Sequence, residues 1–370
     1  MKRTKLFIAL TASAAMLILL QMLLTPKYME HSPEGALIGE YYDNAANNDV
    51  IFIGDCEVYE NFSPITLWEK YGITSYIRGS AQQTIWQSYY LLEETFRYET
   101  PKVVVFNVLS MKYDTPQSTG SQSRREAYNR MTLDTMRWSS SKWNAIQVSM
   151  TEEERRWDGM VTYLLPILRY HDRWSGLTRE DFSYWLRRDT VSHNGYLMQT
   201  GVKPHTADYA EPPLANYSFG ENSWYYLDKM VQLCRQQGTR LVLIKAPSLA
   251  PVWWEQWDDQ ITEYADRNDM LYINMLEHQN DIGIDWSTDT YDGGLHLNVY
   301  GAEKASAWFG QILREQCGLR DHRQEKSLAD LWSDKVSHYY QQKRSLENET
   351  NQLISAGGSH SAQPDGLRLP

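Results

Sequence analysis

The sequence predicts an α/β protein built on a parallel sheet, and three observations lead to that class. Short apolar runs rich in β-branched residues alternate with segments of helical length from residue 48 onward. Each run is continuously apolar, which is typical of strands buried on both faces. The segments between them are long enough for helices that cross from one parallel strand to the next. The five predicted strands are Val50–Ile53, Ser75–Ile77, Val103–Phe106, Leu241–Ile244 and Leu271–Ile273.

Helices are expected in the polar segments that separate or follow these strands. The four clearest are Gln83–Tyr98, Ser223–Gln237, Val252–Arg267 and Ala302–Gln316. Residues 115–220 break the alternation, and we interpret them as a helical insertion because Thr151–Glu154 and Thr178–Asp181 have the pattern of helix starts. The predicted organisation is a stub and membrane segment over 1–30, a linker over 31–48, an α/β domain over 49–318, and a charged helix with a disordered tail over 319–370.

The charge is divided unevenly along the chain. Residues 1–30 carry +3, and the remaining residues of the 370-residue chain, whose net charge is −11, therefore carry −14. A nucleic-acid-binding protein would present a basic face, so we expect no nucleic-acid partner. The three cysteines, Cys56, Cys234 and Cys317, have neither zinc-ligand spacing nor the even number of a disulfide framework. We accordingly expect no metal and no cofactor.

An uncharged stretch of nineteen residues, Leu6–Leu24, follows the basic residues Lys2, Arg3 and Lys5. It is long enough to cross a hydrocarbon layer of about 30 Å as a helix. The positive-inside rule then predicts a cytoplasmic N-terminus, a single-pass anchor in the cell membrane and an extracytoplasmic domain. A cleaved signal peptide is the alternative, but the end of the stretch lacks an A-x-A cleavage site.

In a parallel sheet the ligand site lies beyond the carboxyl ends of the strands, so functional residues are expected where each strand ends. Val50–Ile53 runs directly into Gly54-Asp55-Cys56-Glu57, an arrangement that presents a nucleophile on a tight turn from strand to helix. The block from Ile51 to Pro64 resembles the first block of the SGNH/GDSL hydrolase superfamily, with Cys56 where that family has serine. The resemblance implies a three-layer, flavodoxin-like sheet.

Three later blocks follow in the order that the family has. Gly79 stands after the second strand and Asn107 after the third, where the resemblance implies donors to an oxyanion. Asp292 and His296 resemble the final acid and base block. Acyl transfer needs a nucleophile, a base, an orienting acid and oxyanion donors, which Cys56, His296, Asp292, and Gly79 with Asn107 would supply.

Two features depart from the family pattern. The nucleophile is a thiol flanked by Asp55 and Glu57, whose charges raise the pKa of a thiol, so its activation is expected to come from His296. Three residues separate Asp292 from His296 where the family usually has two. Either Asp289 serves as the acid instead, or Gly293 and Gly294 accommodate the extra residue.

The layout also resembles the anchored proteins of teichoic-acid D-alanylation and of exopolysaccharide O-acetylation. That resemblance implies an acyl esterase or O-acyltransferase, a cell-envelope polysaccharide as substrate and a multi-pass membrane acyltransferase as partner. The alternative is a catalytically inactive scaffold that binds glycan or assembles an envelope-modification complex. Lys245, after the fourth strand, is expected to be a solvated lysine at the start of a loop, with substrate binding as its other interpretation.

Overall fold

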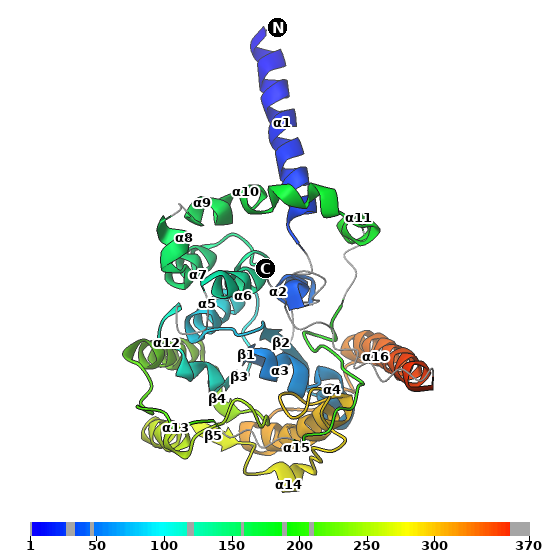
Figure 1. Cartoon of the computed structure of the whole chain (residues 1–370). Coiled ribbons are helices and arrows are strands. Elements are labelled where there is room, and N and C mark those ends of the chain that lie inside the picture. The colour runs from blue at the N-terminus through cyan, green and yellow to red at the C-terminus, as the bar shows by residue number, and fades with distance from the viewer. Residues whose placement is uncertain are drawn as a thin grey trace.

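The computed structural model describes residues 2–26, 34–44, 48–116, 122–156, 159–186, 191–206 and 211–355. Its centre is a parallel five-stranded sheet in the order β2-β1-β3-β4-β5 (Figure 1). This is the flavodoxin-like order, which confirms the predicted fold class. All five predicted strands are present: β1 (Val50–Gly54), β2 (Ser75–Gly79), β3 (Val103–Asn107), β4 (Arg240–Lys245) and β5 (Leu271–Asn274).

Helices cover both faces of the sheet, because alternate side chains of each strand point to opposite sides. Ile51 and Ile53 pack on one side, whereas Val50 and Phe52 pack on the other. The first face is covered mainly by α5 (Ile85–Thr95), α12 (Glu221–Gln237) and α13 (Glu255–Arg267). The second is covered by α3 (Cys56–Asn61), α4 (Pro64–Tyr71) and α15 (Val299–Cys317). The result is a three-layer α/β arrangement with a core on each side of the sheet.

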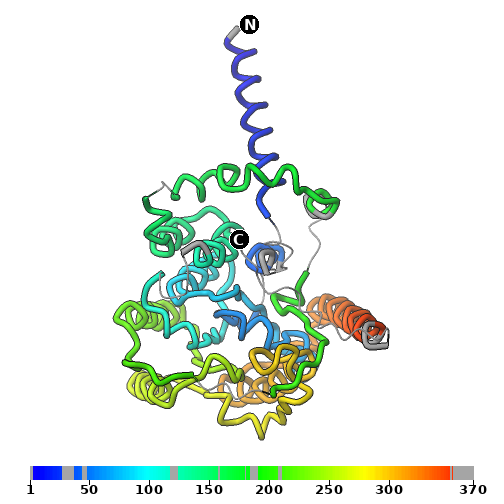
Figure 2. Tube along the Cα trace, viewed as in Figure 1, coloured from blue at the N-terminus to red at the C-terminus, as the bar shows by residue number. Residues whose placement is uncertain are grey.

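The segment predicted as an insertion is helical. Thr151 and Glu154 form the expected capping box, since each backbone N–H bonds the other residue's side chain. Around the end of β3 and through this segment run η1 (Val108–Lys112), α6 (Gln122–Leu133), α7 (Ser140–Ser149), α8 (Glu152–Arg156), α9 (Gly159–Leu164), α10 (Ile167–Tyr170), η3 (His171–Gly176) and α11 (Arg179–Leu186). Figure 2 follows this part of the chain from the sheet toward the N-terminal helix.

The N-terminal apolar stretch forms one long helix, α1 (Lys2–Leu24), which projects from the rest of the molecule (Figure 1). It is long and apolar enough to cross a membrane, with a mean hydropathy of 2.3 over its most apolar window. The prediction of a linker over 31–48 is corrected by the structure, because these residues contain the helix α2 (Glu34–Asn44). Leu37, Ile38 and Tyr41 of α2 are fully buried, so this segment is part of the folded domain.

The predicted charged helix near the C-terminus is present. It is α16 (Lys326–Ser355), and it follows α14 (Gln279–Ile282) and α15 in the chain. Trp332 stacks on Trp68 of α4 with ring centroids 5.0 Å apart, which holds α16 against the second face. The predicted disordered tail, residues 356–370, lies outside the described residues.

Candidate active site

The turn after β1 presents Cys56 at the carboxyl edge of the sheet. Gly54 has a φ of +156°, and a Cβ added there would lie 3.0 Å from Cβ of Asn107, so glycine is the residue that fits. Asp55 then caps α3 by accepting a hydrogen bond from the backbone N–H of Glu57. Cys56 is the first residue of α3 and is half-buried. Strand, glycine and cap together fix the direction of the thiol.

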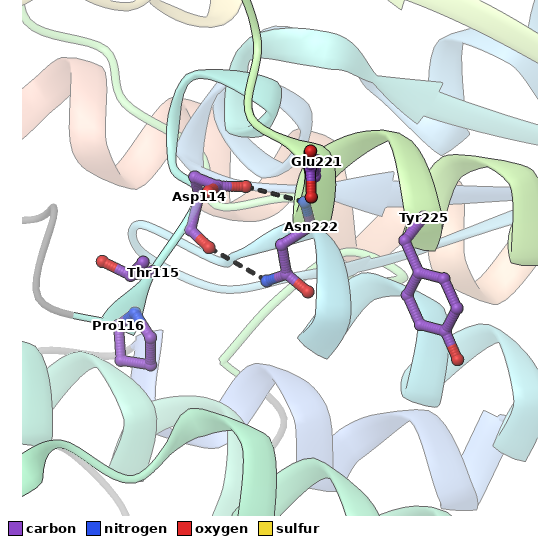
Figure 3. A pocket seen from close by; sticks show the side chains of 6 residues that line it. All are labelled: Asp114, Thr115, Pro116, Glu221, Asn222 and Tyr225. Atoms are coloured by element: carbon purple, nitrogen blue, oxygen red, sulfur yellow. Dashed lines mark hydrogen bonds between the residues drawn. The ribbon is translucent and has the colours of Figure 1, made fainter.

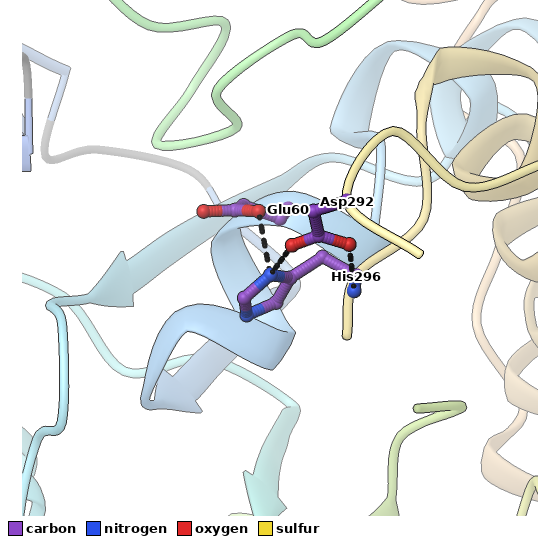
Figure 4. Close-up of side chains that lie close together, drawn as sticks. All are labelled: Glu60, Asp292 and His296. Atoms are coloured by element: carbon purple, nitrogen blue, oxygen red, sulfur yellow. Dashed lines mark hydrogen bonds and ion pairs between the residues drawn. The ribbon is translucent and has the colours of Figure 1, made fainter. Parts of the chain in front are cut away.

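His296 lies beside this thiol, as the sequence pattern predicts. The Cys56 side chain lies close enough to the His296 ring for the imidazole to lower the pKa of the thiol. On the other side of the ring, Nδ1 lies 2.7 Å from Oδ2 of Asp292 (Figure 4). Because Asp292 holds Nδ1, Nε2 is the nitrogen left to face the thiol. The arrangement has the order nucleophile, base and orienting acid.

The extra residue between Asp292 and His296 is absorbed by a glycine turn. Gly293 and Gly294 have φ values of +87° and +105°, which allow the loop to fold back on itself. Oδ1 of Asp292 consequently accepts a hydrogen bond of 2.9 Å from the backbone N–H of His296. Asp289, the other candidate acid, instead pairs with Lys304 at 2.6 Å. The geometry therefore places Asp292, and not Asp289, against the imidazole.

A second carboxylate, which the sequence reasoning missed, also contacts the imidazole. Oε2 of Glu60 lies 3.3 Å from Nδ1 of His296, and Glu60 accepts a hydrogen bond from the Tyr291 hydroxyl. The Tyr291 ring lies nearly parallel to the imidazole at 6.2 Å between centroids. Glu60 follows Cys56 by four residues on α3, so helical periodicity could have placed it on the same face as the nucleophile.

Burial and these charges control the protonation of the pair. Burial raises the pKa of the Cys56 thiol, with Asp55 and Glu60 adding to the rise and His296 opposing it. Burial would lower the pKa of His296, but Glu60, Cys56 and Asp292 outweigh it, so the pKa lies well above its ordinary value. At neutral pH the thiol and the imidazole both tend to hold their protons. Loss of one proton from the pair creates the reactive form, which higher pH favours.

Replacing Glu60 by glutamine should change how reaction of an ester with Cys56 depends on pH. In a plot of kcat/KM for p-nitrophenyl acetate against pH, the acid limb should move to lower pH. The change removes a charge that raises the pKa values of both His296 and Cys56, yet it keeps a hydrogen-bonding group for Tyr291. At a pH on the acid limb, we expect kcat/KM of the E60Q variant, expressed as a fraction of its plateau value, to be about threefold or more above that of the parent. The matched control is E69Q, whose glutamate bonds Tyr340 on α16. An acid limb that is unmoved or shifted upward would contradict this assignment.

Asn107 ends β3 next to the nucleophile turn, but its amide is already engaged. Its Nδ2 donates to Asp55 at 3.1 Å and to Glu57 at 2.8 Å, and its Oδ1 accepts from the backbone N–H of Ala246. Both N–H bonds thus hold carboxylates of the turn. In this arrangement Asn107 is a positioning residue, and donation to an oxyanion, which stays a prediction, would require it to exchange one of these bonds.

Gly79 ends β2 directly opposite Gly54 in the register of the sheet. A Cβ at this position would lie 2.9 Å from Val58 and 3.0 Å from Tyr59, so the backbone of Gly79 comes close to α3. The structure brings Gly79 to the same edge as Cys56, as the sequence predicts. Its role as an oxyanion donor stays a prediction.

The expectation that Lys245 is solvated is wrong. Its side chain is fully buried, and its Nζ lies 2.9 Å and 3.0 Å from the two carboxylate oxygens of Glu57. Ser248 also donates to Glu57, so the carboxylate is surrounded by Lys245, Ser248 and Asn107. The end of β4 is buried, so water cannot solvate the ammonium of Lys245. The ion pair with Glu57 compensates for the lost solvation and makes this burial possible.

The only group of metal-ligand type found among the described residues is formed by Glu60, Asp292 and His296 (Figure 4). One ligand atom from each residue lies within 4.8 Å of the others. Asp292 is hydrogen-bonded to His296 and Glu60 to Tyr291, so both carboxylates already have protein partners. These contacts suit a role in orienting and charging the imidazole. The expectation of a site without metal stays a prediction.

A surface pocket of about 510 Å³ lies at the start of α12 (Figure 3). It is lined by Asp114, Thr115, Pro116, Glu221, Asn222 and Tyr225, which include none of the predicted site residues. Asp114 has a structural role there, since its Oδ1 accepts from the backbone N–H groups of Asn222 and Ser223 in the first turn of α12. The candidate chemistry is therefore located at Cys56 and not in this pocket.

No family model matches the chain, and none of the curated proteins matches it. Among solved structures it is similar to a proposed acylhydrolase from Bacteroides fragilis, at 12% sequence identity and a TM-score of 0.37. The match covers 75% of this chain and 95% of the other. Similarity at this level carries no argument about activity, which has to be argued from the site itself.

Proposed function

We propose that the chain is a membrane-anchored, extracytoplasmic enzyme of the SGNH type, an acyl esterase or O-acyltransferase that acts on a cell-envelope glycan. The observation that carries the proposal is the placement of His296 beside Cys56, with Asp292 hydrogen-bonded to its Nδ1, at the carboxyl edge of a flavodoxin-order sheet. This geometry supplies a nucleophile, a base and an acid that orients the base. The ester bond as target and the glycan as substrate rest on the resemblance of the sequence blocks.

In this mechanism His296 accepts the thiol proton while Sγ of Cys56 attacks the acyl carbon of a donor ester. The sulfur–carbon bond forms, the bond from that carbon to the alcohol oxygen breaks, and His296 returns the proton to the leaving alcohol. A hydroxyl of the glycan, or water, then attacks the thioester, and its proton passes through His296 to the departing thiolate. The backbone N–H groups of Cys56 and Gly79 are the proposed donors to the oxyanion.

Anchoring is proposed from α1. The helix is apolar over Arg3–Leu24, and Lys2, Arg3 and Lys5 at its start favour a cytoplasmic N-terminus. Its last residue is tied to the folded part of the chain, because Arg173 donates a 2.7 Å hydrogen bond to the carbonyl of Leu24. That contact supports an uncleaved anchor. A multi-pass acyltransferase in the same membrane is the proposed partner, and it would supply the acyl group.

The test is acylation of the full chain in detergent micelles with p-nitrophenyl acetate. We expect a burst of p-nitrophenol close to one equivalent and, after acid quenching, an acetyl adduct on Cys56 by mass spectrometry. The C56A variant should lose both signals. The matched control is C317A, since Cys317 is another half-buried free cysteine, and this variant should retain both. Equal ester turnover by C56A and the parent would overturn the proposal.

The second candidate function is an inactive scaffold that binds glycan, and two observations favour it. Burial raises the pKa of the Cys56 thiol, and the Asn107 amide is held by Asp55 and Glu57. A scaffold would give no acetyl adduct at any pH, and its affinity for envelope polysaccharide would be the same in the parent, C56A and H296A. An enzyme would instead show adduct formation that increases with pH.

A further inference from the structure

The helices at the base of α1 form a row, defined here as the platform and consisting of α9, α10, η3 and α11. The last part of α1 contacts α10, η3 and α11. Figure 1 shows the row lying across the lower end of α1, between that helix and the rest of the molecule. Leu24 is buried in this contact region, whereas residues 3–20 of α1 are exposed. The platform therefore marks the level at which the apolar helix enters the folded protein.

One face of the platform packs on the molecule. Tyr163 belongs to the buried core, and the Arg130 guanidinium lies over its ring at 3.6 Å from the centroid. Tyr170 donates a hydrogen bond to Asp134. Both contacts are made with α6 or the residue that follows it, so the opposite face of α9 and α10 points away from the body of the protein.

That outward face is apolar and exposed. Val161, Leu164, Leu165 and Leu168 follow the spacing i, i+3, i+4 and i+7 through α9, the turn at Leu165 and α10. Backbone hydrogen bonds from Leu165 to Val161 and from Leu168 to Leu165 keep this stretch close to helical, which places the four side chains in one stripe. Their exposed fractions are 41–50%. Further along the platform, Trp174 is 72% exposed and Phe182 is 46% exposed. Exposed apolar side chains that recur on one side of a segment are costly in water and indicate a surface that is covered by something.

The position of α1 identifies the occupant. A helix of 22 residues spans about 33 Å, close to the thickness of the hydrocarbon layer, so its two ends lie near the two membrane surfaces. Whatever packs against its last turn must then lie at the boundary between lipid and water. The platform is held there by the bond from Arg173 to Leu24. Leucine, phenylalanine and tryptophan at that depth are typical of helices that lie in the interface.

We propose that the platform is a membrane-docking surface, whose stripe of Val161, Leu164, Leu165 and Leu168, together with Trp174 and Phe182, inserts into the lipid interface. The inference rests on the proposed role of α1 as an anchor and goes beyond it. A single spanning helix does not by itself set the orientation of the domain that it anchors. Docking of the platform would instead hold the α/β domain in one orientation, with the Cys56 edge at a fixed height above the membrane.

The test is site-specific photocrosslinking of the full chain in vesicles of phosphatidylcholine and phosphatidylglycerol that carry an alkyne on one acyl chain. Benzoylphenylalanine replaces one residue at a time at Leu17 in α1, at Leu168 in the stripe, and at Leu331 in α16. Leu331 is the matched control for Leu168, because both are leucines whose exposed fractions are near half, 51% and 50%. After illumination, lipid attached to the protein is measured through the alkyne.

We expect lipid adduct at positions 17 and 168 and only background at 331. Adduct at 17 with background at 168 would overturn the docking surface while leaving the anchor in place. Background at both 17 and 168 would overturn the anchor and the docking surface together. Crosslinking of position 168 to another protein in cell membranes, without lipid adduct, would assign the stripe to a protein partner and would also overturn the proposal.

Discussion

Replacing His296 by alanine is expected to reduce kcat for ester turnover by about 10²- to 10⁴-fold, the usual contribution of a positioned general base. The loss has two sources. The thiol, whose pKa burial raises, no longer has a group that accepts its proton, and the water that attacks the thioester no longer has a base. The measurement is steady-state hydrolysis of p-nitrophenyl acetate by the full chain, across the pH range in which the parent is active.

The matched control for this prediction is H278A. His278 is a partly exposed histidine before α14, and it contacts Asp281 and the ring of Trp308. It should retain activity within about threefold of the parent. If H296A falls no further than H278A while Cys56 still acquires an acetyl group, the thiol reacts without the imidazole. In that case the proposed triad is wrong.

Replacing Lys245 by methionine should destabilise the domain by about 3–5 kcal/mol, because it leaves the Glu57 carboxylate buried without its cation. For a domain of this size that loss corresponds to a decrease in Tm of about 6–20 °C. The measurement is thermal unfolding of the full chain in detergent, followed by circular dichroism. Asn107 and Ser248 would remain as hydrogen-bond donors to Glu57, but neither carries a compensating charge.

The control is the same substitution in an exposed ion pair. Lys102 lies 3.0 Å from Asp49, and its side chain is 48% exposed, so K102M should cost at most about 1 kcal/mol. The double variant E57L/K245M removes both buried charges and should recover much of the loss seen in K245M. Equal Tm values for K245M and K102M would show that the buried pair contributes nothing beyond an ordinary surface contact.

Local patterns in the sequence were sufficient to predict the strands of the fold. The five strands appear because each is a short β-branched run with apolar residues on both sides of the chain, a pattern that depends on no partner. Gly54 at the end of β1 and Cys56 two residues later predicted the turn from strand to helix in the same way. The helix over residues 34–44 was missed because it is short and only its packed side, with Leu37, Ile38 and Tyr41, distinguishes it from a linker.

The contacts around the nucleophile depend on residues that are distant in the chain. Glu57 and Lys245 are 188 residues apart, and they meet only because the sheet brings the start of α3 and the end of β4 to the same edge. The second carboxylate at the imidazole, Glu60, needs both the turn of α3 and the fold of the loop before α15 to reach His296. A sequence pattern gives the type of each residue but not the partner that a charge finds when it is buried.

What the sequence by itself determined is the class of the fold, the apolar N-terminal helix and the residue types of a Cys-His-Asp arrangement, because these follow from periodicity and from the order of short blocks. What only the tertiary structure decided is which aspartate contacts His296, what Asn107 and Lys245 bond, and that a stripe of exposed leucines lies at the base of α1. The physical reason is that hydrogen bonds, ion pairs and burial are properties of distances in space, and the chain brings those distances about only when its helices and strands pack.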